Sequence, residues 1–137
     1  MSVLIDTSVW SLALRRRRRD INSTELKVYY EWERLVLDGT ASLIGPIRQE
    51  TVSGIAAPRE VAIVKQRLAP VHEFALPSDL FLLAADFFNH CRAAGIAPGA
   101  IDMMICAAAH SNGVPIFSTD PDFSFYARHL PISLHTY

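Results

Sequence analysis

Two short apolar runs in this chain end in the same way, at an acidic residue with a threonine beside it. The first run is Ser2–Ile5, which leads into Asp6. The second is Val114–Phe117, which leads into Asp120. A short apolar run that stops at turn residues is typical of a strand buried in a parallel sheet. Because ligands bind outside the carboxyl ends of such strands, we expect both acids at one functional edge of the sheet.

The rest of the chain alternates between strand and helix patterns. Further strands are predicted at Ala41–Ile44, at Val71–Leu76 (an edge strand or extended segment) and at Ile132–His135. Helices are predicted from about Val9, over 24–37, from Gly45, and over 58–68, 78–94 and 98–111. This alternation predicts an α/β fold, specifically an α/β/α sandwich with a mainly parallel central sheet. No linker or repeat interrupts the pattern, so residues 1–137 are predicted to form a single domain.

Charge is distributed unevenly along the chain. Thirteen basic and 14 acidic residues give a net charge of −1, which excludes a generally basic nucleic-acid binder. An apolar content of 50% likewise excludes an acidic disordered segment. Residues 1–70 carry 11 basic and 8 acidic residues, whereas residues 71–137 carry 2 basic and 6 acidic ones. Acids without local cations either bind a metal ion or lie scattered in solvent.

Four acidic residues are predicted at the functional edge: Asp6, Glu50, Asp102 and Asp120. Taken alone, each has an ordinary role as a helix cap, a first-turn charge, a turn former or a solvated helix residue. Taken together, carboxylates in one place repel one another unless they are protonated or bridged by a divalent cation. Oxygen ligands suit Mg²⁺ or Mn²⁺. Phosphodiester hydrolysis needs such a site, because the cation lowers the pKa of a bound water and neutralises charge on the phosphate.

The threonines beside two of these acids allow two interpretations. Together with Ser8, Thr7 and Thr119 would hold metal ligands or water in position through hydrogen bonds, or they would simply cap a helix and form a turn. A phosphatase or receiver-like α/β domain also carries acids at its strand ends. The first strand here lacks the Asp-x-Asp pair that such a domain would need.

The two cysteines and the apolar runs bear on location. Cys91 and Cys106 fit no metal-binding spacing and lie in apolar helical patterns, so they are predicted to be buried free thiols in a reducing compartment. No apolar run approaches the ~18 residues of a membrane span. We therefore expect a cytoplasmic protein that does not insert into a membrane.

Four stretches, in this order and spacing, resemble one known family. They are Val3–Trp10, Gly45–Glu50, Ile101–Ala109 and Phe117–Phe123. Together they resemble the PIN-domain ribonucleases, and in particular the VapC toxins of toxin–antitoxin pairs. The order and spacing of all four stretches along the whole chain are much more specific than any one of them.

The resemblance implies a type II toxin, an endoribonuclease that depends on Mg²⁺ or Mn²⁺. The four catalytic acids of the family match Asp6, Glu50, Asp102 and Asp120, and Asp122 is a neighbouring acid that would assist or replace Asp120. Asp6, Asp102 and Asp120 would hold the cation, while Glu50 would be a further ligand or would position the attacking water. The resemblance also implies an RNA substrate, a VapB-type antitoxin and a homodimer. Pro121 stands where the family often has a basic residue, which affects substrate contacts.

The most prominent charge run is Arg15, Arg16, Arg17, Arg18 and Arg19. One interpretation is a solvated helix end or loop. The other is a surface for RNA phosphates or for an acidic antitoxin segment, because the run follows Asp6 closely and is expected near the acidic edge. The five histidines show no ligand spacing and are expected at the surface or as caps: His72, His90, His110, His129 and His135. The alternative to an enzyme is a catalytically inactive PIN-like module that binds RNA or a protein.

Overall fold

The computed structural model describes residues 1–137 and contains one parallel sheet. Its strands are β1 (Val3–Ile5), β2 (Ala41–Ile44), β3 (His72–Phe74) and β4 (Ile116–Phe117), in the spatial order β3-β2-β1-β4. Every pairing is parallel. All residues of β1, β2 and β4 are buried, as the continuous apolar runs predict for strands covered on both faces.

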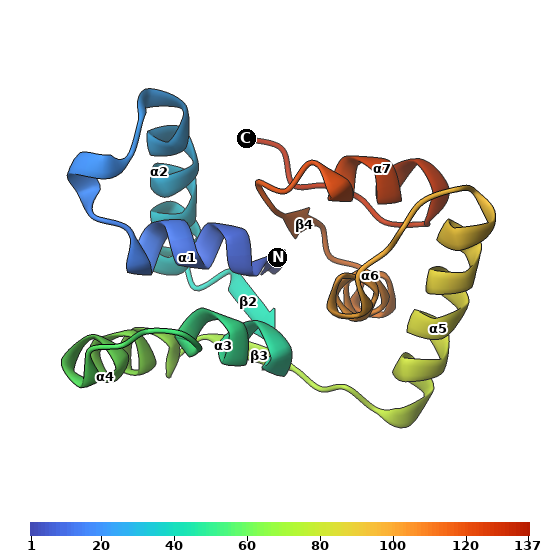
Figure 1. Cartoon of the computed structure of the whole chain (residues 1–137), viewed down its shortest axis with the longest axis horizontal. Coiled ribbons are helices and arrows are strands. Elements are labelled where there is room, and N and C mark those ends of the chain that lie inside the picture. Colours follow the sequence, from blue (N-terminus) through green and yellow to red (C-terminus); the bar gives the residue numbers. More distant parts are fainter.

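Helices cover both faces of this sheet. They are α1 (Thr7–Arg15), α2 (Ser23–Leu37), α3 (Gly45–Val52), α4 (Pro58–Leu68), α5 (Ser78–Ala93), α6 (Ala100–Asn112) and α7 (Asp122–His129). Figure 1 shows α1 to α4 on one side of the strands and α5 to α7 on the other. The predicted α/β/α sandwich is confirmed. None of its helices combines the length and the apolar character of a membrane span.

The direction of the chain across the sheet reverses once. From β1 the chain steps to β2 and then to β3, whereas the connection through α5 and α6 returns it to β4 on the far side of β1. Right-handed crossovers in opposite directions put their helices on opposite faces. The point between β1 and β4 is therefore the topological switch point, where α/β sheets of this kind form a crevice for ligands.

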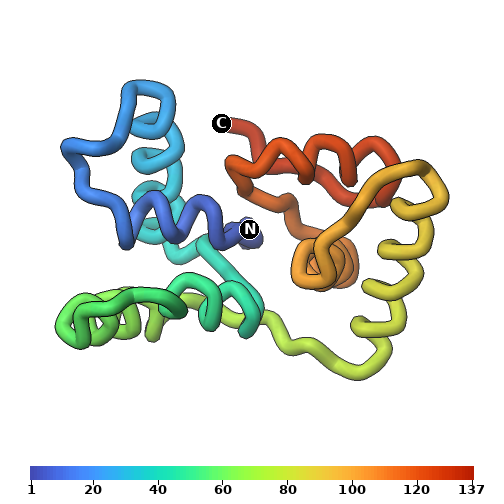
Figure 2. Tube along the Cα trace, in the orientation of Figure 1, coloured from blue at the N-terminus to red at the C-terminus, as the bar shows by residue number.

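The two faces come from the two halves of the sequence (Figure 2). The part up to α4 forms one side and the part from α5 onward forms the other. The uneven charge of the sequence consequently becomes a difference between two sides of the molecule. The cation-rich half lies on one side, and most of the acid-rich half lies on the other.

The core lies between the sheet and these helices. It comprises 30 buried apolar residues, among them the completely buried Leu4, Leu43 and Ile105. Burying each such side chain stabilises the fold by roughly 1.5–3 kcal/mol. Trp10 packs edge-on against Trp32 and donates a 3.0 Å hydrogen bond from Nε1 to a β1 carbonyl. Cys91 and Cys106 are buried free thiols, as expected.

The strand predicted at Ile132–His135 does not form. The segment 132–135 forms only an isolated parallel bridge, between Leu134 and Ile116 of β4. Two backbone hydrogen bonds join it to Ile116, at 2.9 Å to the Ser133 carbonyl and at 2.7 Å from the His135 amide. A side chain adds to them, because the Nε2 atom of His135 pairs with Glu31 of α2. The expectation of a surface or capping histidine is thus wrong for His135, whose side chain is only 12% exposed.

Helix α7 has no counterpart in the predicted elements. The stretch around Pro121 has the residues of a turn, and the Asx turn is present: the Asp122 amide donates to Asp120 Oδ1 at 2.9 Å. The chain then continues as a helix, with Phe123 and Tyr126 three residues apart on its buried side. Proline is favoured at a helix start because it has no amide hydrogen to leave unpaired. This helix brings Tyr126 to the acidic edge.

Candidate metal-binding active site

Asp6 lies between β1 and α1, where its side chain caps the helix. Its Oδ2 atom accepts hydrogen bonds from the hydroxyls of Ser8 and Ser118, each at 2.8 Å, and a longer one from the Ser8 amide at 3.4 Å. The ordinary capping role of this residue is therefore present. The carboxylate is nevertheless buried at the switch point, with only 6% of the residue exposed. Capping and a place in the site are compatible.

The loop after β4 places two further acids. The Asp120 amide donates to Ser118 Oγ at 3.0 Å, and the Thr119 amide donates to Ser8 Oγ at 3.0 Å. The serine hydroxyls therefore connect the ends of β1 and β4, because each accepts from this loop and donates to Asp6. The Thr119 side chain does less than expected, since this residue contributes its amide rather than its hydroxyl.

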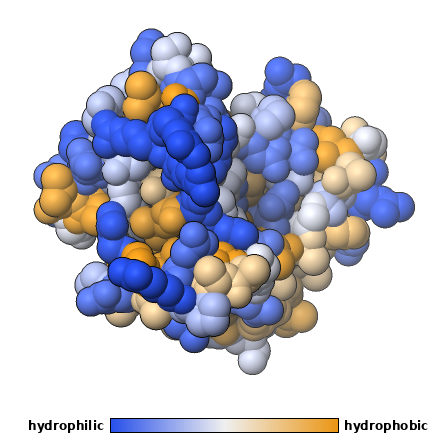
Figure 3. All heavy atoms as spheres, turned by 60° about the vertical axis from the view of Figure 1, so that its left-hand side comes forward, coloured by the Kyte–Doolittle hydropathy of each residue, from blue (hydrophilic) through white to orange (hydrophobic).

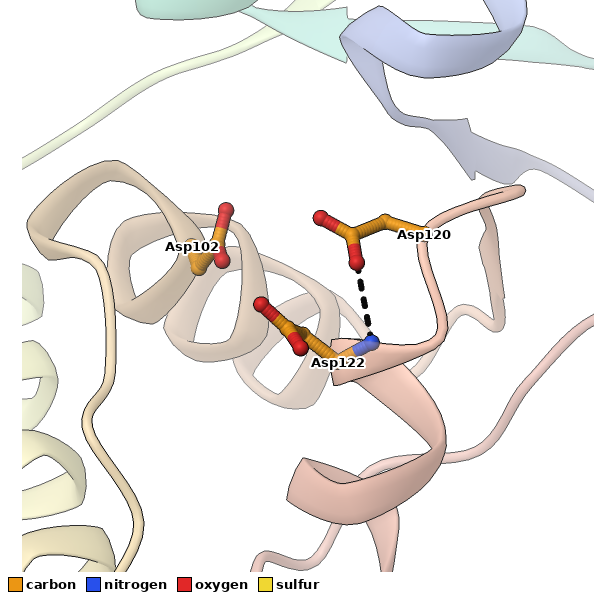
Figure 4. Close-up of side chains that lie close together, drawn as sticks. All are labelled: Asp102, Asp120 and Asp122. Carbon is orange, nitrogen blue, oxygen red and sulfur yellow. Dashed lines mark hydrogen bonds between the residues drawn. The ribbon is translucent and has the colours of Figure 1, made fainter.

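Asp102 completes a cluster of three carboxylates. It lies in the first turn of α6, as predicted. One oxygen each from Asp102, Asp120 and Asp122 lie within 4.8 Å of one another. Figure 4 shows the three carboxylates pointing toward a common space, from α6, from the loop after β4 and from the start of α7. None of the three takes part in a salt bridge.

The pKa of Asp102 reflects both its burial and the nearby acids. Burial raises its pKa to about 6, a hydrogen bond from Tyr126 opposes the rise, and the charges of Asp6, Asp120 and Asp122 add to it. Burial, and then the contact with Asp102, raise the pKa of Tyr126 above its usual range. Tyrosine therefore remains the proton donor in this pair. A divalent cation would relieve the repulsion among the acids, so the donor set fits Mg²⁺ or Mn²⁺.

Glu50 lies apart from the three-carboxylate cluster. It is in α3, and its Oε1 atom accepts a 2.8 Å hydrogen bond from the Thr7 hydroxyl. Thr7 thus has a side-chain contact that links the start of α1 to α3. The structure brings Asp122 rather than Asp6 or Glu50 into the tightest group with Asp102 and Asp120.

Two residues of the site have no role predicted from the sequence. Ser118 directly follows the apolar run of β4 and lies two residues before Asp120. A hydroxyl so close to an acid at a strand end could have been predicted to support that acid. Tyr126 offers no such signal, because its position depends on α7, which is not predicted. Its Oη atom donates to Asp102 Oδ2 at 2.8 Å.

The arginine run lies at the other end of α1 from Asp6. Helix α1 ends at Arg15, about 14 Å along the axis for nine residues. The expectation that the run lies near the acidic edge is wrong, because a helix that follows a parallel strand runs back along the sheet. Figure 3 shows a broad band of hydrophilic side chains on this side of the molecule.

The five arginines differ in what they contact. Arg15 donates to the Ser53 carbonyl at 3.2 Å, and Arg16 pairs with Glu25. Arg18 donates to the Tyr30 hydroxyl at 2.7 Å and lies over the Tyr29 ring. Arg17 and Arg19 are exposed and make no side-chain hydrogen bond or salt bridge within the chain. The last two are therefore the members of the run that are free for a partner.

The fold and the site together define an α/β domain with a carboxylate centre at its switch point, suited to a divalent cation. The family model described as "PIN domain" matches residues 3–128, and the chain belongs to that family. The predicted resemblance to PIN domains is thereby confirmed. No curated protein matches the sequence significantly.

Solved structures of the same fold cover almost the whole chain. VapBC2 from Rickettsia felis, bound to a promoter DNA fragment, has a TM-score of 0.75 at 14% identity and covers 98% of both chains. FitAcB from Neisseria gonorrhoeae has a TM-score of 0.68 at 19% identity, covering 98% of this chain and 96% of that one. VapC20 from Mycobacterium tuberculosis, a sarcin–ricin loop cleaving toxin, has a TM-score of 0.67 at 19% identity, covering 94% and 96%.

Proposed function

We propose that this chain is a VapC-type toxin, an endoribonuclease that depends on Mg²⁺ or Mn²⁺. The observation that carries the proposal is the convergence of Asp102, Asp120 and Asp122 within 4.8 Å at the switch point, without a basic partner. A site of this kind is unfavourable for the metal-free protein and favourable for the metal-bound one. Membership of the PIN family and the similar VapC structures support the same function.

Asp102, Asp120 and Asp6 would hold the cation, with Asp122 as a further ligand beside Asp120. When bound, a divalent cation lowers the pKa of a coordinated water and offsets charge that develops on the scissile phosphate. Ser8 and Ser118 fix the Asp6 carboxylate, and the Asp122 amide fixes that of Asp120. Hydrogen bonds donated to a carboxylate in this way hold it in the orientation in which it binds a metal ion.

Glu50 would position the attacking water and accept its proton. The Thr7 hydroxyl occupies Oε1 of this carboxylate and leaves Oε2 without a protein donor. The proton of the water would go to Oε2 as the new oxygen–phosphorus bond forms and the ester bond breaks, and the leaving ribose oxygen would take a proton from solvent water. Substitution of Thr7 by valine would release this orientation while keeping the shape of the side chain.

The proposed partners follow from the same class of protein. RNA is the substrate, a VapB-type antitoxin is the inhibitor, and the cytoplasm, where both occur, is the place of action. Arg17 and Arg19 would contact RNA phosphates or an acidic antitoxin segment. A homodimer would use the apolar strip of α5, where Phe81 is 45% and Leu82 is 70% exposed.

The deciding experiment is RNA cleavage by the purified full chain. Total RNA and a sarcin–ricin hairpin serve as substrates, with Mg²⁺ or Mn²⁺, and with EDTA as the chelated control. Asp6→Asn and Asp102→Asn should reduce cleavage by at least 100-fold, about 2.7 kcal/mol of lost transition-state stabilisation. Asp86→Asn, a change of an exposed acid on α5, should cleave normally. Cleavage that survives EDTA would refute the mechanism, while RNA binding without cleavage would favour the inactive PIN-like module.

A further inference from the structure

The two oxygens of the Asp102 carboxylate differ in their contacts with the protein. Oδ2 accepts a 2.8 Å hydrogen bond from the Tyr126 hydroxyl. Gly99, the residue before α6, lies close to the same oxygen. A Cβ atom at this position would approach Oδ2 to 3.3 Å and Cγ to 3.4 Å. Oδ1, by contrast, accepts no hydrogen bond from the protein.

Tyr126 is fixed in its place. The residue is only 1% exposed, and its ring packs edge-on against Phe123 with centroids 5.3 Å apart. The Gly99 amide donates a long hydrogen bond, of 3.5 Å, to the tyrosine oxygen. That contact orients the hydroxyl, because an oxygen that faces an N–H donor directs its own hydrogen elsewhere. The hydrogen is thereby directed at Asp102.

The glycine is explained by space and not by backbone conformation. Gly99 has φ −83° and ψ 144°, which any residue can adopt. A larger residue at this position would crowd the Asp102 carboxylate. Two positions that are distant in sequence, one before α6 and one on α7, therefore enclose the same oxygen.

We propose that Tyr126 is a positioning residue and that Tyr126 and Gly99 form a socket for Oδ2 of Asp102. The socket leaves Oδ1, which accepts no hydrogen bond from the protein, for the cation that the convergence of Asp102, Asp120 and Asp122 (Figure 4) would hold. A ligand held in one orientation loses less freedom when the metal binds, and partners of this kind are worth about 10- to 100-fold in metal affinity. The inference rests on the proposed metal-dependent function, which it deepens.

The test is the affinity of the purified full chain for Mn²⁺, measured by titration calorimetry, with RNA cleavage as a second readout. Tyr126→Phe keeps the ring and its packing against Phe123 and removes only the hydroxyl. We expect Mn²⁺ binding at least 10-fold weaker, and cleavage that recovers when Mn²⁺ is raised by the same factor. Tyr29→Phe is the matched control, since this hydroxyl makes no hydrogen bond, and its Mn²⁺ affinity should equal that of the wild type.

A second variant approaches the socket from its other side. Gly99→Ala keeps the backbone conformation but crowds Oδ2, so it should also weaken Mn²⁺ binding, and it serves as the test if Tyr126→Phe does not fold. Wild-type Mn²⁺ affinity in both folded variants, with loss of binding in Asp102→Asn, would overturn the socket and leave the proposed function intact. Undiminished binding in Asp102→Asn would overturn the metal site itself, and the socket with it.

Discussion

Ser118 donates a 2.8 Å hydrogen bond to Oδ2 of Asp6, and these two residues follow neighbouring parallel strands. The same hydroxyl accepts from the Asp120 amide at 3.0 Å. A single side chain therefore fixes the relative position of two acids that are more than a hundred residues apart in sequence. The spacing of the carboxylates is set by this contact as well as by the strands themselves.

Ser118→Ala should weaken both stability and metal binding. The substitution removes a donor from a buried carboxylate and an acceptor from a backbone amide, so we expect a loss of about 1–3 kcal/mol in the free energy of unfolding. Mn²⁺ affinity should fall by about 10-fold, because Asp6 and Asp120 lose a common support. Denaturant unfolding and calorimetry measure the two effects. Ser124→Ala, on the exposed side of α7, is the control and should change neither.

The raised pKa of Asp102 predicts how stability depends on pH without metal. Burial raises this pKa from 3.8 to about 6, so the folded state holds the proton more tightly than the unfolded state. Its stabilising contribution is complete below about pH 4 and is lost as the pH rises through about 6. After a discount for partial exposure, the loss is on the order of 1–2 kcal/mol.

The measurement is denaturant unfolding in EDTA between pH 4 and pH 7.5. The difference between wild type and Asp102→Asn isolates this residue from the other acids. Relative to the wild type, the variant should gain stability as the pH rises across that range. A difference that does not change with pH would show that the pKa of Asp102 is not raised in the metal-free protein.

Metal binding should reverse this dependence. Protons and the cation compete for Asp102, so Mn²⁺ should raise the unfolding midpoint more at pH 7.5 than at pH 5.5. At 100 times its dissociation constant, a ligand specific for the folded state stabilises it by about 2.7 kcal/mol. Thermal unfolding with a Mn²⁺ series at both pH values measures the effect. An equal shift at both pH values would argue against a carboxylate site.

Much of the fold can be predicted because its strands have strong local signals. The runs that form β1 and β2 are apolar, partly β-branched and bounded by turn residues, and the predicted bounds of α4 match the observed ones. The parallel arrangement then follows from alternation with helices. The edge that gathers Asp120 and Asp102 can be predicted as well. Asp120 follows the carboxyl end of a parallel strand, and Asp102 lies in the first turn of the helix before that strand, which begins at the same edge.

What cannot be predicted depends on contacts between distant segments. The segment around Leu134 has a strand-like pattern, yet His135 binds Glu31 of α2, and only one bridge to β4 forms. The local sequence carries no signal for this contact, and the place of Tyr126 is unpredictable for the same physical reason. The orientation of α1 away from the acidic edge is different, because it follows from the parallel topology that the sequence predicts.

The contact between Glu31 and the C-terminal segment should contribute to stability. Glu31 is buried, and a hydrogen bond from Arg34 lowers its pKa, opposed by burial and supported by His135. A lowered carboxyl pKa contributes stability above about pH 4.5 that is lost as the pH falls below it. Glu31→Gln should therefore cost about 1–3 kcal/mol at pH 7 and less at pH 3.5. Glu33→Gln, on the same helix and without an ion pair, is the matched control and should stay within about 0.5 kcal/mol.

The arginine run supplies the last prediction, because its members are not equivalent. Arg16 and Arg18 are engaged within the chain, whereas Arg17 and Arg19 are exposed and free. If the free pair contacts RNA phosphates, the double change of Arg17 and Arg19 to Gln should weaken binding of single-stranded RNA. It should also reduce the slope of log affinity against log salt by about 0.7 for each phosphate that is no longer neutralised. Arg92→Gln, on the opposite side of the sheet, should leave both unchanged.

Fluorescence anisotropy over a salt series provides the measurement, with the variants kept at one Mn²⁺ concentration. An unaltered slope would assign the run to the antitoxin or to solvent, since counterions are released only where phosphates are bound.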